Sequence, residues 1–262
     1  MQKIIDHFQK VYKNLPLIYG LTERHVASRY RGSVLGFLWS LINPLMLMGI
    51  YTLVFKYYIK FDSIPYYSVF MLTGLLPWIW ITSSISEGAT SITSSGHLVT
   101  KAMFPAQVLP LVVVLGSLVH FLLSILVLIV FSLCLGKAFT LSSIFLPIIV
   151  FFQFIFLYGI SLVVSALNVR FRDIQHIIPN IFSLLFFLCP IVYTVNSVPE
   201  RFRWTLTVNP FAFFIGIYHK VIFDGEFLSI YEGLILIIVS TISLYIGVSY
   251  FEKSKEGLAE CL

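Results

Sequence analysis

Charged residues are scarce in this sequence. Asp, Glu, Lys and Arg make up 11 % of its 262 residues, against roughly a quarter in an ordinary soluble domain. Hydrophobic residues make up 58 % of the chain. A soluble fold has too little interior to bury that much apolar surface, so the lipid bilayer must be the solvent. We therefore expect an all-α integral membrane protein.

Cysteine is almost as scarce. The three cysteines are odd in number, and Cys134, Cys189 and Cys261 show neither a disulfide framework nor a zinc spacing. The sequence also has no H-E-x-x-H or similar set of metal-ligand residues. We expect no metal site in this chain.

Nucleotide-hydrolysis and catalytic motifs are absent as well. No G-x-x-x-x-G-K-[ST] loop occurs, so the chain cannot hydrolyse a nucleotide by that route, and any energy must come from another protein. No Ser, His and Asp set can be argued from spacing alone. We assign no catalytic residue; these observations do not exclude an enzyme, but nothing in the sequence specifies one.

Acidic residues are missing from the middle of the apolar runs, where an ion-driven transporter usually places a carboxylate. Asp62, Asp173 and Glu200 fall in loops or at the ends of runs, and Glu87 lies toward the inner end of the second run. His120 is the one ionisable residue deep inside a run. We interpret it as a hydrogen bond between helices in preference to a proton relay, and ion coupling is not expected.

The apolar runs are long enough to cross a bilayer, which takes about 20 residues of helix. The run from Trp204 to Phe223 is an exception, because Asn209-Pro210 breaks it and charged residues crowd its far end. It predicts a re-entrant external hairpin before the last span. The remaining runs predict six transmembrane helices, at residues 32–55, 63–86, 102–136, 138–169, 174–199 and 233–251.

The N-terminal stretch has the periodicity of an amphipathic helix that lies on the membrane surface. Pro16 interrupts this helix, and a basic segment then leads into the bilayer. No cleavage pattern follows the first apolar run, so we expect no removable signal peptide. The apolar face comprises Ile4, Ile5, Phe8, Val11, Tyr12 and Leu15, and the polar face Lys3, Asp6, His7, Gln9, Lys10 and Lys13.

The Lys and Arg residues predict the orientation. With the N-terminus inside and six spans, eleven of the seventeen basic residues lie on the cytoplasmic side and six outside. Both termini are therefore expected in the cytoplasm. The basic residues lie mainly beside the apolar runs, which favours a role in topology over nucleic-acid binding.

The stretch between the second and third runs offers a place for a partner. Ser94, Ser95 and Gly96 end one helix, and Pro105 suits the first turn of the next. A short helix between them could dock onto a soluble motor, although a plain tight connection fits the spacing equally well. The residues concerned are His97, Leu98, Val99, Thr100, Lys101, Ala102 and Met103.

Aromatic residues are abundant, at 16 % of the chain, more than interfacial belts require. Two helical stripes could line a path, because aromatic faces suit the C–H faces of sugars. Such stripes are, however, more often used for packing or lipid contact than for lining a path. The first comprises Trp39, Tyr51, Phe55 and Tyr58, and the second Phe182, Phe186 and Tyr193.

A set of ordered motifs resembles the permease subunits of type-2 ABC exporters for bacterial polysaccharides, with the O-antigen permeases nearest. The resemblance covers nearly the whole chain. Cys189 departs from the small polar residue often found at its position. The matching motifs are Arg29-Tyr30-Arg31, Leu35-Gly36, Trp39 to Pro44, Lys101 to Pro105, Leu109-Pro110, Phe171 to Ile174, Cys189 to Tyr193, and Asn209-Pro210-Phe211.

This resemblance implies a homodimeric permease in the bacterial inner membrane, bound to two copies of an ATP-binding subunit. It implies that the cargo is a polysaccharide linked to polyprenyl pyrophosphate, that MgATP binds the partner, and that this chain needs no cofactor. The N-terminal helix and residues 97–103 would contact the ATPase. Residues 1–262 would form one membrane domain, with 1–31 as the cytoplasmic interfacial segment, 32–251 as the six-span bundle and 252–262 as a cytoplasmic tail.

Within this scheme, Arg24, Arg29 and Arg31 are candidates for binding the lipid pyrophosphate, because guanidinium groups bind phosphate oxygens in pairs. Alternatives remain open. A type-2 ABC exporter of drugs or small lipids would share the same plan. A membrane enzyme acting on lipid-linked sugars would need catalytic carboxylates at one membrane face, and an autonomous channel would need no ATPase.

Overall fold

The computed structural model describes residues 2–60, 64–96 and 104–258. Within these ranges the regular structure is helical and contains no strand, which confirms the all-α prediction. Two π-helical segments, Leu53–Tyr58 and His219–Asp224, continue helices α3 and α10. The α-helices are α1 (Gln2–Lys13), α2 (Leu15–Tyr30), α3 (Trp39–Thr52), α4 (Tyr67–Thr90), α6 (Val108–Cys134), α7 (Leu146–Arg170), α8 (Ile174–Phe187), α9 (Trp204–Val208), α10 (Pro210–Tyr218) and α11 (Ile230–Leu258).

Five helical stretches in the described part of the chain are long and apolar enough to span a membrane: Trp39–Tyr58, Tyr67–Thr90, Val108–Cys134, Leu141–Arg170 and Ile230–Lys255. Helix α8 occupies the predicted fifth run but has only 14 residues. It is shorter than the predicted 174–199 because Pro190 lacks an N–H group and disfavours helix at the residue before it. The multi-pass plan is confirmed. In the described part of the chain five of the six predicted spans are long enough to cross a membrane, and α8, in place of the predicted fifth, is a shorter apolar helix.

The run that the sequence treats as a hairpin is bent by 96° between Glu200–Val208 and Pro210–Asp224. The bend has a local cause. The side chain of Asn209 accepts a hydrogen bond from the Phe211 N–H at 3.0 Å, and Pro210 occupies the first turn of α10. This geometry fits the predicted re-entrant hairpin.

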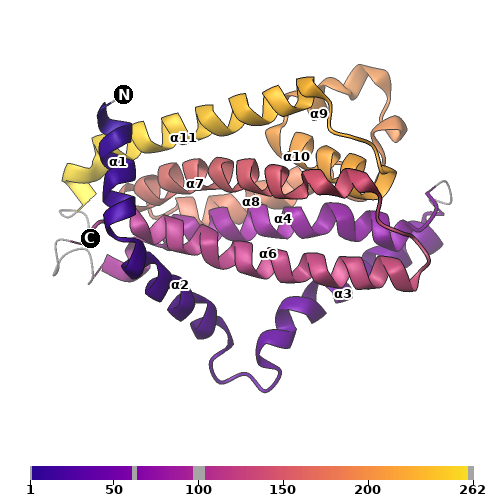
Figure 1. The fold of residues 1–262 in the computed structure, drawn as a ribbon, viewed down its shortest axis with the longest axis horizontal. Helices are drawn as coiled ribbons and strands as arrows, with labels where there is room; N and C mark the ends of the chain where they lie inside the picture. The colour runs from indigo at the N-terminus through magenta and orange to yellow at the C-terminus, as the bar shows by residue number, and fades with distance from the viewer. Residues whose placement is uncertain (1, 61–63, 97–103, 259–262) are drawn as a thin grey trace.

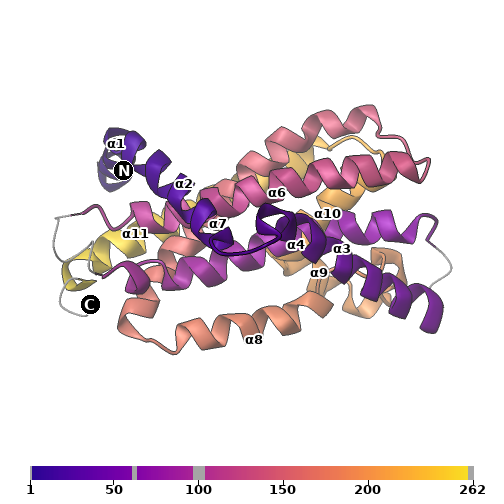
Figure 2. The ribbon, with the colours of Figure 1, turned by 90° about the horizontal axis from the view of Figure 1, so that it is seen from below.

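Helix α4 lies at the centre of the bundle, where it contacts α3, α6, α7, α8 and α10. Most of its residues are buried, whereas α3 and α8 have widely exposed apolar faces. Helices α2 and α3 diverge from the bundle and form a V in Figure 1. The two termini lie at the same end (Figures 1 and 2), as the alternating topology requires.

Helices α7 and α11 approach each other so closely that their backbones touch. A Cβ atom on Gly159 would lie 2.5 Å from the Ser243 carbonyl, and one on Gly247 would lie 2.3 Å from the Gly159 oxygen. The hydroxyls of Ser240 and Ser243 donate hydrogen bonds across the interface to carbonyl oxygens of α7, each at 2.8 Å. Glycine and serine residues thus occupy the interface of these two membrane helices, where bulky apolar side chains would keep the backbones apart.

The N-terminal helix α1 is held to the bundle by His7. The prediction that His7 lies on a solvated polar face is wrong, because its side chain is fully buried between α7 and α11. Its Nε2 lies 2.8 Å from the Tyr158 hydroxyl, which donates to the Gln107 carbonyl at 3.3 Å, and its Nδ1 lies 3.6 Å from Glu252. Burial lowers the pKa of His7, and the opposing effect of Glu252 is smaller. A helix face that packs on protein can bury a polar residue when partners meet it there.

We predict that His7→Ala will release α1 from the bundle, because the variant leaves the Tyr158 hydroxyl without its histidine partner and opens a cavity. The expected loss is roughly 1–3 kcal/mol of docking free energy. Hydrogen–deuterium exchange of residues 2–13 measures it directly. Gln9→Ala, on an exposed side chain of the same helix, is the matched control. Equal protection of α1 in both variants would contradict the assignment.

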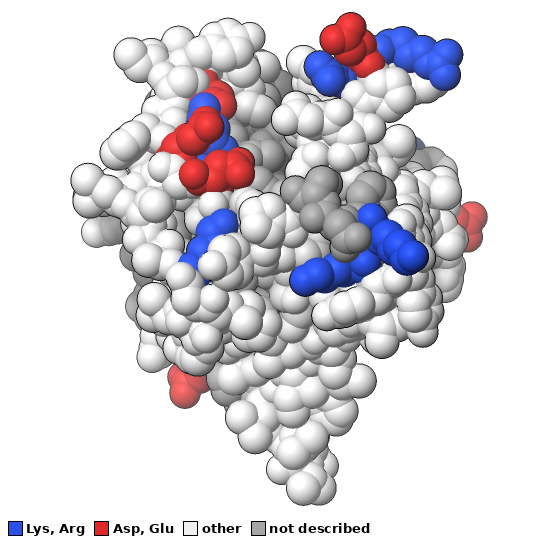
Figure 3. Space-filling view, turned by 90° about the vertical axis from the view of Figure 1, so that its right-hand side faces the viewer, with Lys and Arg blue, Asp and Glu red and all other residues white. Residues whose placement is uncertain are grey.

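At the end of the bundle away from the two termini, the charged residues form a few small groups on a largely uncharged face (Figure 3). Lys220 contacts Glu232 at 2.9 Å and Glu226 at 4.0 Å, and Ser229 caps α11 by hydrogen bonding with Glu232. Lys137 lies 3.0 Å above the ring of Phe223. These contacts tie the loops before α7 and α11 to the hairpin.

Candidate functional site

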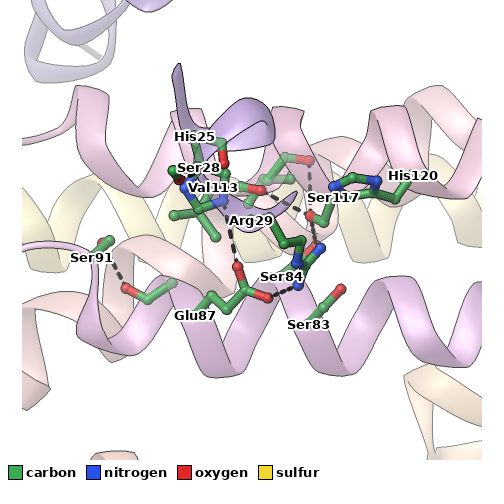
Figure 4. Close-up of polar contacts among 12 residues, drawn as sticks. His25, Ser28, Arg29, Ser83, Ser84, Glu87, Ser91, Val113, Ser117 and His120 are labelled. Atoms are coloured by element: carbon green, nitrogen blue, oxygen red, sulfur yellow. Dashed lines mark hydrogen bonds and ion pairs between the residues drawn. The ribbon is translucent and has the colours of Figure 1, made fainter. Parts of the chain in front are cut away.

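A charged cluster joins the C-terminal half of α2 to α4 (Figure 4). Arg29 forms an ion pair with Glu87, and His25 Nε2 lies 3.4 Å from the other oxygen of the same carboxylate. His25 and Arg29 are four residues apart and therefore share one face of α2. All three side chains are about one-third exposed. One carboxylate thus contacts two basic side chains at an accessible position.

A cavity of about 360 Å³ lies on one side of this cluster, between α2, α3, α4 and α6. We call it the histidine cavity, because His120 lines it with Arg29, Tyr30, Trp39 and Asn43. The Tyr30 hydroxyl lies 3.0 Å from His120 Nδ1. The prediction that His120 makes a hydrogen bond between helices is confirmed, with α2 as the partner helix.

A second cavity, of about 430 Å³, lies on the other side of the cluster. We call it the serine cavity. Glu87 and His25 line it, whereas Arg29 lines the histidine cavity, so the ion pair stands between the two spaces. Its other polar lining residues are Arg24, Ser28, Thr90, Ser91, Ser94 and Ser95.

The structure separates the three predicted arginines. Arg24 borders the serine cavity and Arg29 borders the histidine cavity, but Arg31 lies exposed beyond the end of α2 and lines neither space. His25 and the pairing role of Glu87 were not foreseen. Two sequence signals could have found them: the spacing of His25 and Arg29, and the position of Glu87 as the only charged residue in α4.

Only some residues of the two predicted aromatic stripes line a common cavity. A third space of about 400 Å³, the aromatic cavity, lies between the first span, α4 and α8, and Tyr51, Phe182 and Phe186 line it. Tyr51 stacks on Phe186 with ring centroids 5.3 Å apart. The residues Trp78, Thr82 and Ser86 complete the wall from α4, and their regular four-residue spacing was the missed signal.

The other predicted aromatics lie elsewhere. Trp39 lines the histidine cavity, Phe55 packs against the core, and Tyr58 is exposed. The Tyr193 hydroxyl donates to the Phe187 carbonyl at 3.0 Å, outside the cavity lining. The predicted coupling segment, residues 97–103, lies outside the described residues.

The described helices form a polytopic bundle with cavities on both sides of a charged cluster that joins α2 to α4, an arrangement that suits a membrane transport protein. The chain belongs to the ABC-2 type transporter family, whose profile matches residues 16–223.

Curated relatives narrow this class. The chain is 34 % identical over 256 residues to the O-antigen export system permease protein RfbA of Myxococcus xanthus, covering 97 % of this chain and 98 % of the relative. It is 36 % identical over 253 residues to the protein of that name from Klebsiella pneumoniae, covering 94 % and 95 %. The polysialic acid transport protein KpsM of Escherichia coli is 23 % identical over 246 residues, covering 90 % and 92 %. Because the RfbA relatives are named as permeases, a transport role is supported over an enzymatic one.

Proposed function

We propose that this chain is the membrane subunit of an ATP-driven exporter that moves O-antigen or a similar polysaccharide, linked to polyprenyl pyrophosphate, across the bacterial inner membrane. The observation that carries the proposal is the full-length similarity to O-antigen export permeases. Two copies of the chain form the pore. Both termini, and the end of the bundle near the charged cluster, face the cytoplasm.

ATP hydrolysis belongs to a separate ATP-binding subunit, present in two copies and binding MgATP. Family membership supports this division of labour. The N-terminal helix and residues 97–103 dock onto the ATPase. The position of α1 supports this, because His7 fixes α1 against α7 and α11 on the side of the bundle where both termini lie (Figure 1).

Arg24, Arg29 and Arg31 receive the pyrophosphate head group. The cavities beside Arg24 and Arg29 support the proposal, since each offers room next to a guanidinium group. Arg31 contributes from the exposed end of α2, where it attracts anions at longer range. The sugar chain passes the aromatic cavity, whose walls combine flat rings with the hydroxyls of Thr82, Ser86 and Ser183.

We predict that Tyr51→Leu combined with Phe187→Leu will slow polysaccharide export roughly two- to tenfold, because both side chains line the aromatic cavity and supply stacking surface. Export in a deletion strain, measured from surface polysaccharide, tests this. Phe151→Leu is the matched control, because Phe151 is similarly exposed on α7 and lies outside the cavity lining. An unchanged rate in the double variant would count against a sugar path along this wall.

The proposed function is tested by purifying the tagged chain from its native membrane and assaying ATP hydrolysis with and without lipid-linked glycan. We expect an ATPase subunit to co-purify in equal stoichiometry and glycan to change the hydrolysis rate. A dimer that conducts without nucleotide, or a chain that purifies alone and shows glycan-transfer activity, would overturn the proposal.

A further inference from the structure

Glu87 is the only charged residue in α4, the most buried helix of the bundle. A charge inside a membrane helix is costly, and its presence there usually has a functional reason. The structure shows its contacts: both oxygens of the carboxylate face basic side chains of α2, Arg29 and His25. Glu87 therefore already occupies the place where an external anion would bind Arg29.

The helix that carries Glu87 is fixed. Ser84 and Ser117 hydroxyls lie 2.7 Å apart and join α4 to α6, and the Ser161 hydroxyl donates to the Ser84 carbonyl at 3.2 Å. A Cβ atom on Gly88 would lie 2.9 Å from the Ser161 hydroxyl oxygen. Glu87 thus projects from a backbone that is packed against two neighbouring helices.

The C-terminal half of α2, by contrast, is held by polar contacts. Ile18 is the only buried residue of α2, and it lies in the first turn. Farther along, α2 is attached by the Glu87 contacts, by His25 packed over Gly116, and by Tyr30 hydrogen bonded to His120. Polar contacts at a partly exposed site can be exchanged for contacts to another anion, whereas buried apolar packing cannot.

An anion has room to reach these contacts from both sides. The histidine cavity opens onto Arg29, and the serine cavity opens onto His25 and Arg24. The hydroxyls of Ser28, Thr90, Ser91 and Ser94 donate to carbonyls one turn earlier in their own helices. Attraction for an anion at this place therefore rests on Arg24, His25 and Arg29, and Glu87 contacts the last two of these.

We propose that Glu87 is an internal competitor for a phosphate-bearing ligand: it holds Arg29 and His25 until the ligand displaces it, and displacement frees the C-terminal half of α2 from α4. The inference rests on the proposed function, since it names the regulation of the same pyrophosphate site. A pyrophosphate group carries more negative charge than one carboxylate and offers more oxygens, so it outcompetes Glu87 for a guanidinium group. The released carboxylate and the bound phosphate then repel each other, which separates α2 from the fixed helix α4. Binding of the ligand at this site thereby moves α2, the helix that follows α1.

The test measures binding to the full chain in nanodiscs with two probes, inorganic pyrophosphate and geranylgeranyl pyrophosphate. Glu87→Gln keeps the size of the side chain but removes the competing charge, so we expect about tenfold tighter binding of the probe. Glu87→Asp, which keeps the charge but shortens its reach, should give a smaller gain in the same direction. Glu23→Gln removes a carboxylate from an exposed position on α2 that lines neither cavity, so this control should bind like the unmodified chain.

The two probes also identify the source of the phosphate. A gain with geranylgeranyl pyrophosphate alone supports the proposal with a lipid head group as ligand, and a gain with inorganic pyrophosphate alone supports it with a soluble anion. Unchanged or weaker binding of both probes by Glu87→Gln overturns the proposal. If Arg29→Gln still weakens binding in that case, the pyrophosphate site stands and only the competition by Glu87 is lost. If Arg29→Gln also has no effect, the pyrophosphate site itself is wrong.

A separate measurement tests the displacement of α2. Spin labels at Ala27, in the C-terminal half of α2, and at Phe171, after α7, both exposed, report the distance between these elements. In the unmodified chain we expect geranylgeranyl pyrophosphate to shift the distance distribution, and we expect Glu87→Gln to show the shifted distribution without ligand. A distribution that is identical with and without saturating ligand would overturn the proposed displacement of α2.

Discussion

Replacing Arg29 with glutamine is expected to reduce export of polysaccharide and binding of pyrophosphate probes by roughly ten- to a hundredfold. The structural reason is that Arg29 is the guanidinium group that lines the histidine cavity. A charge-assisted hydrogen bond contributes about 1.5–3 kcal/mol, and each 1.4 kcal/mol is tenfold in affinity. Glutamine retains a hydrogen-bond donor but lacks both the charge and the paired geometry that phosphate binding uses.

The measurement for Arg29→Gln is surface polysaccharide in a complemented deletion strain, together with probe binding by the purified chain. Arg170→Gln is the matched control, because Arg170 is an exposed arginine at the end of α7 and lines neither cavity beside the cluster. Arg31→Gln should have a smaller effect than Arg29→Gln, since the structure places Arg31 outside both cavities. Equal activity of Arg29→Gln and Arg170→Gln would remove Arg29 from the site.

Replacing Gly159 with valine is expected to prevent α7 and α11 from packing, at a cost of about 3 kcal/mol or more. The Cβ atom of the new side chain would lie 2.5 Å from the Ser243 backbone, which cannot move aside as a flexible side chain would. Separation of the helices would also break the hydrogen bonds from Ser240 and Ser243. The clash and the lost hydrogen bonds both weaken the attachment of α11, which is the longest helix in the described part of the chain.

The measurement for Gly159→Val is the thermal unfolding midpoint and the size-exclusion profile of the purified chain in detergent. Gly233→Val introduces the same side chain near the start of α11, where no atom lies within 4 Å of the new Cβ position. We expect the Gly233 variant to unfold near the temperature of the unmodified chain and the Gly159 variant to aggregate or unfold well below it. Similar midpoints for the two variants would show that the α7–α11 contact tolerates separation.

The sequence by itself determined the membrane character and the plan of the bundle. Long apolar runs have to become helices in a bilayer, because each helix satisfies its own backbone hydrogen bonds. The break at Asn209-Pro210 determined the hairpin in the same way, since proline cannot continue a helix from within and asparagine caps the next one. These are local effects, which depend on neighbouring residues along the chain.

Only the tertiary structure decided which side chains meet. Glu87 and Arg29 are 58 positions apart, and His7 and Tyr158 are 151 apart, so no local pattern connects either pair. The end of α2 at Tyr30 separated Arg31 from Arg29. The rotation of the helices about their axes brought Trp78 rather than Tyr58 to the aromatic cavity. Helix rotation is set by how whole faces pack, and small residues such as Gly116 and Gly159 set how near the helices come. The physical reason is that hydrophobicity along the chain specifies where a helix crosses the membrane, whereas contacts between helices specify which of its faces points to the site.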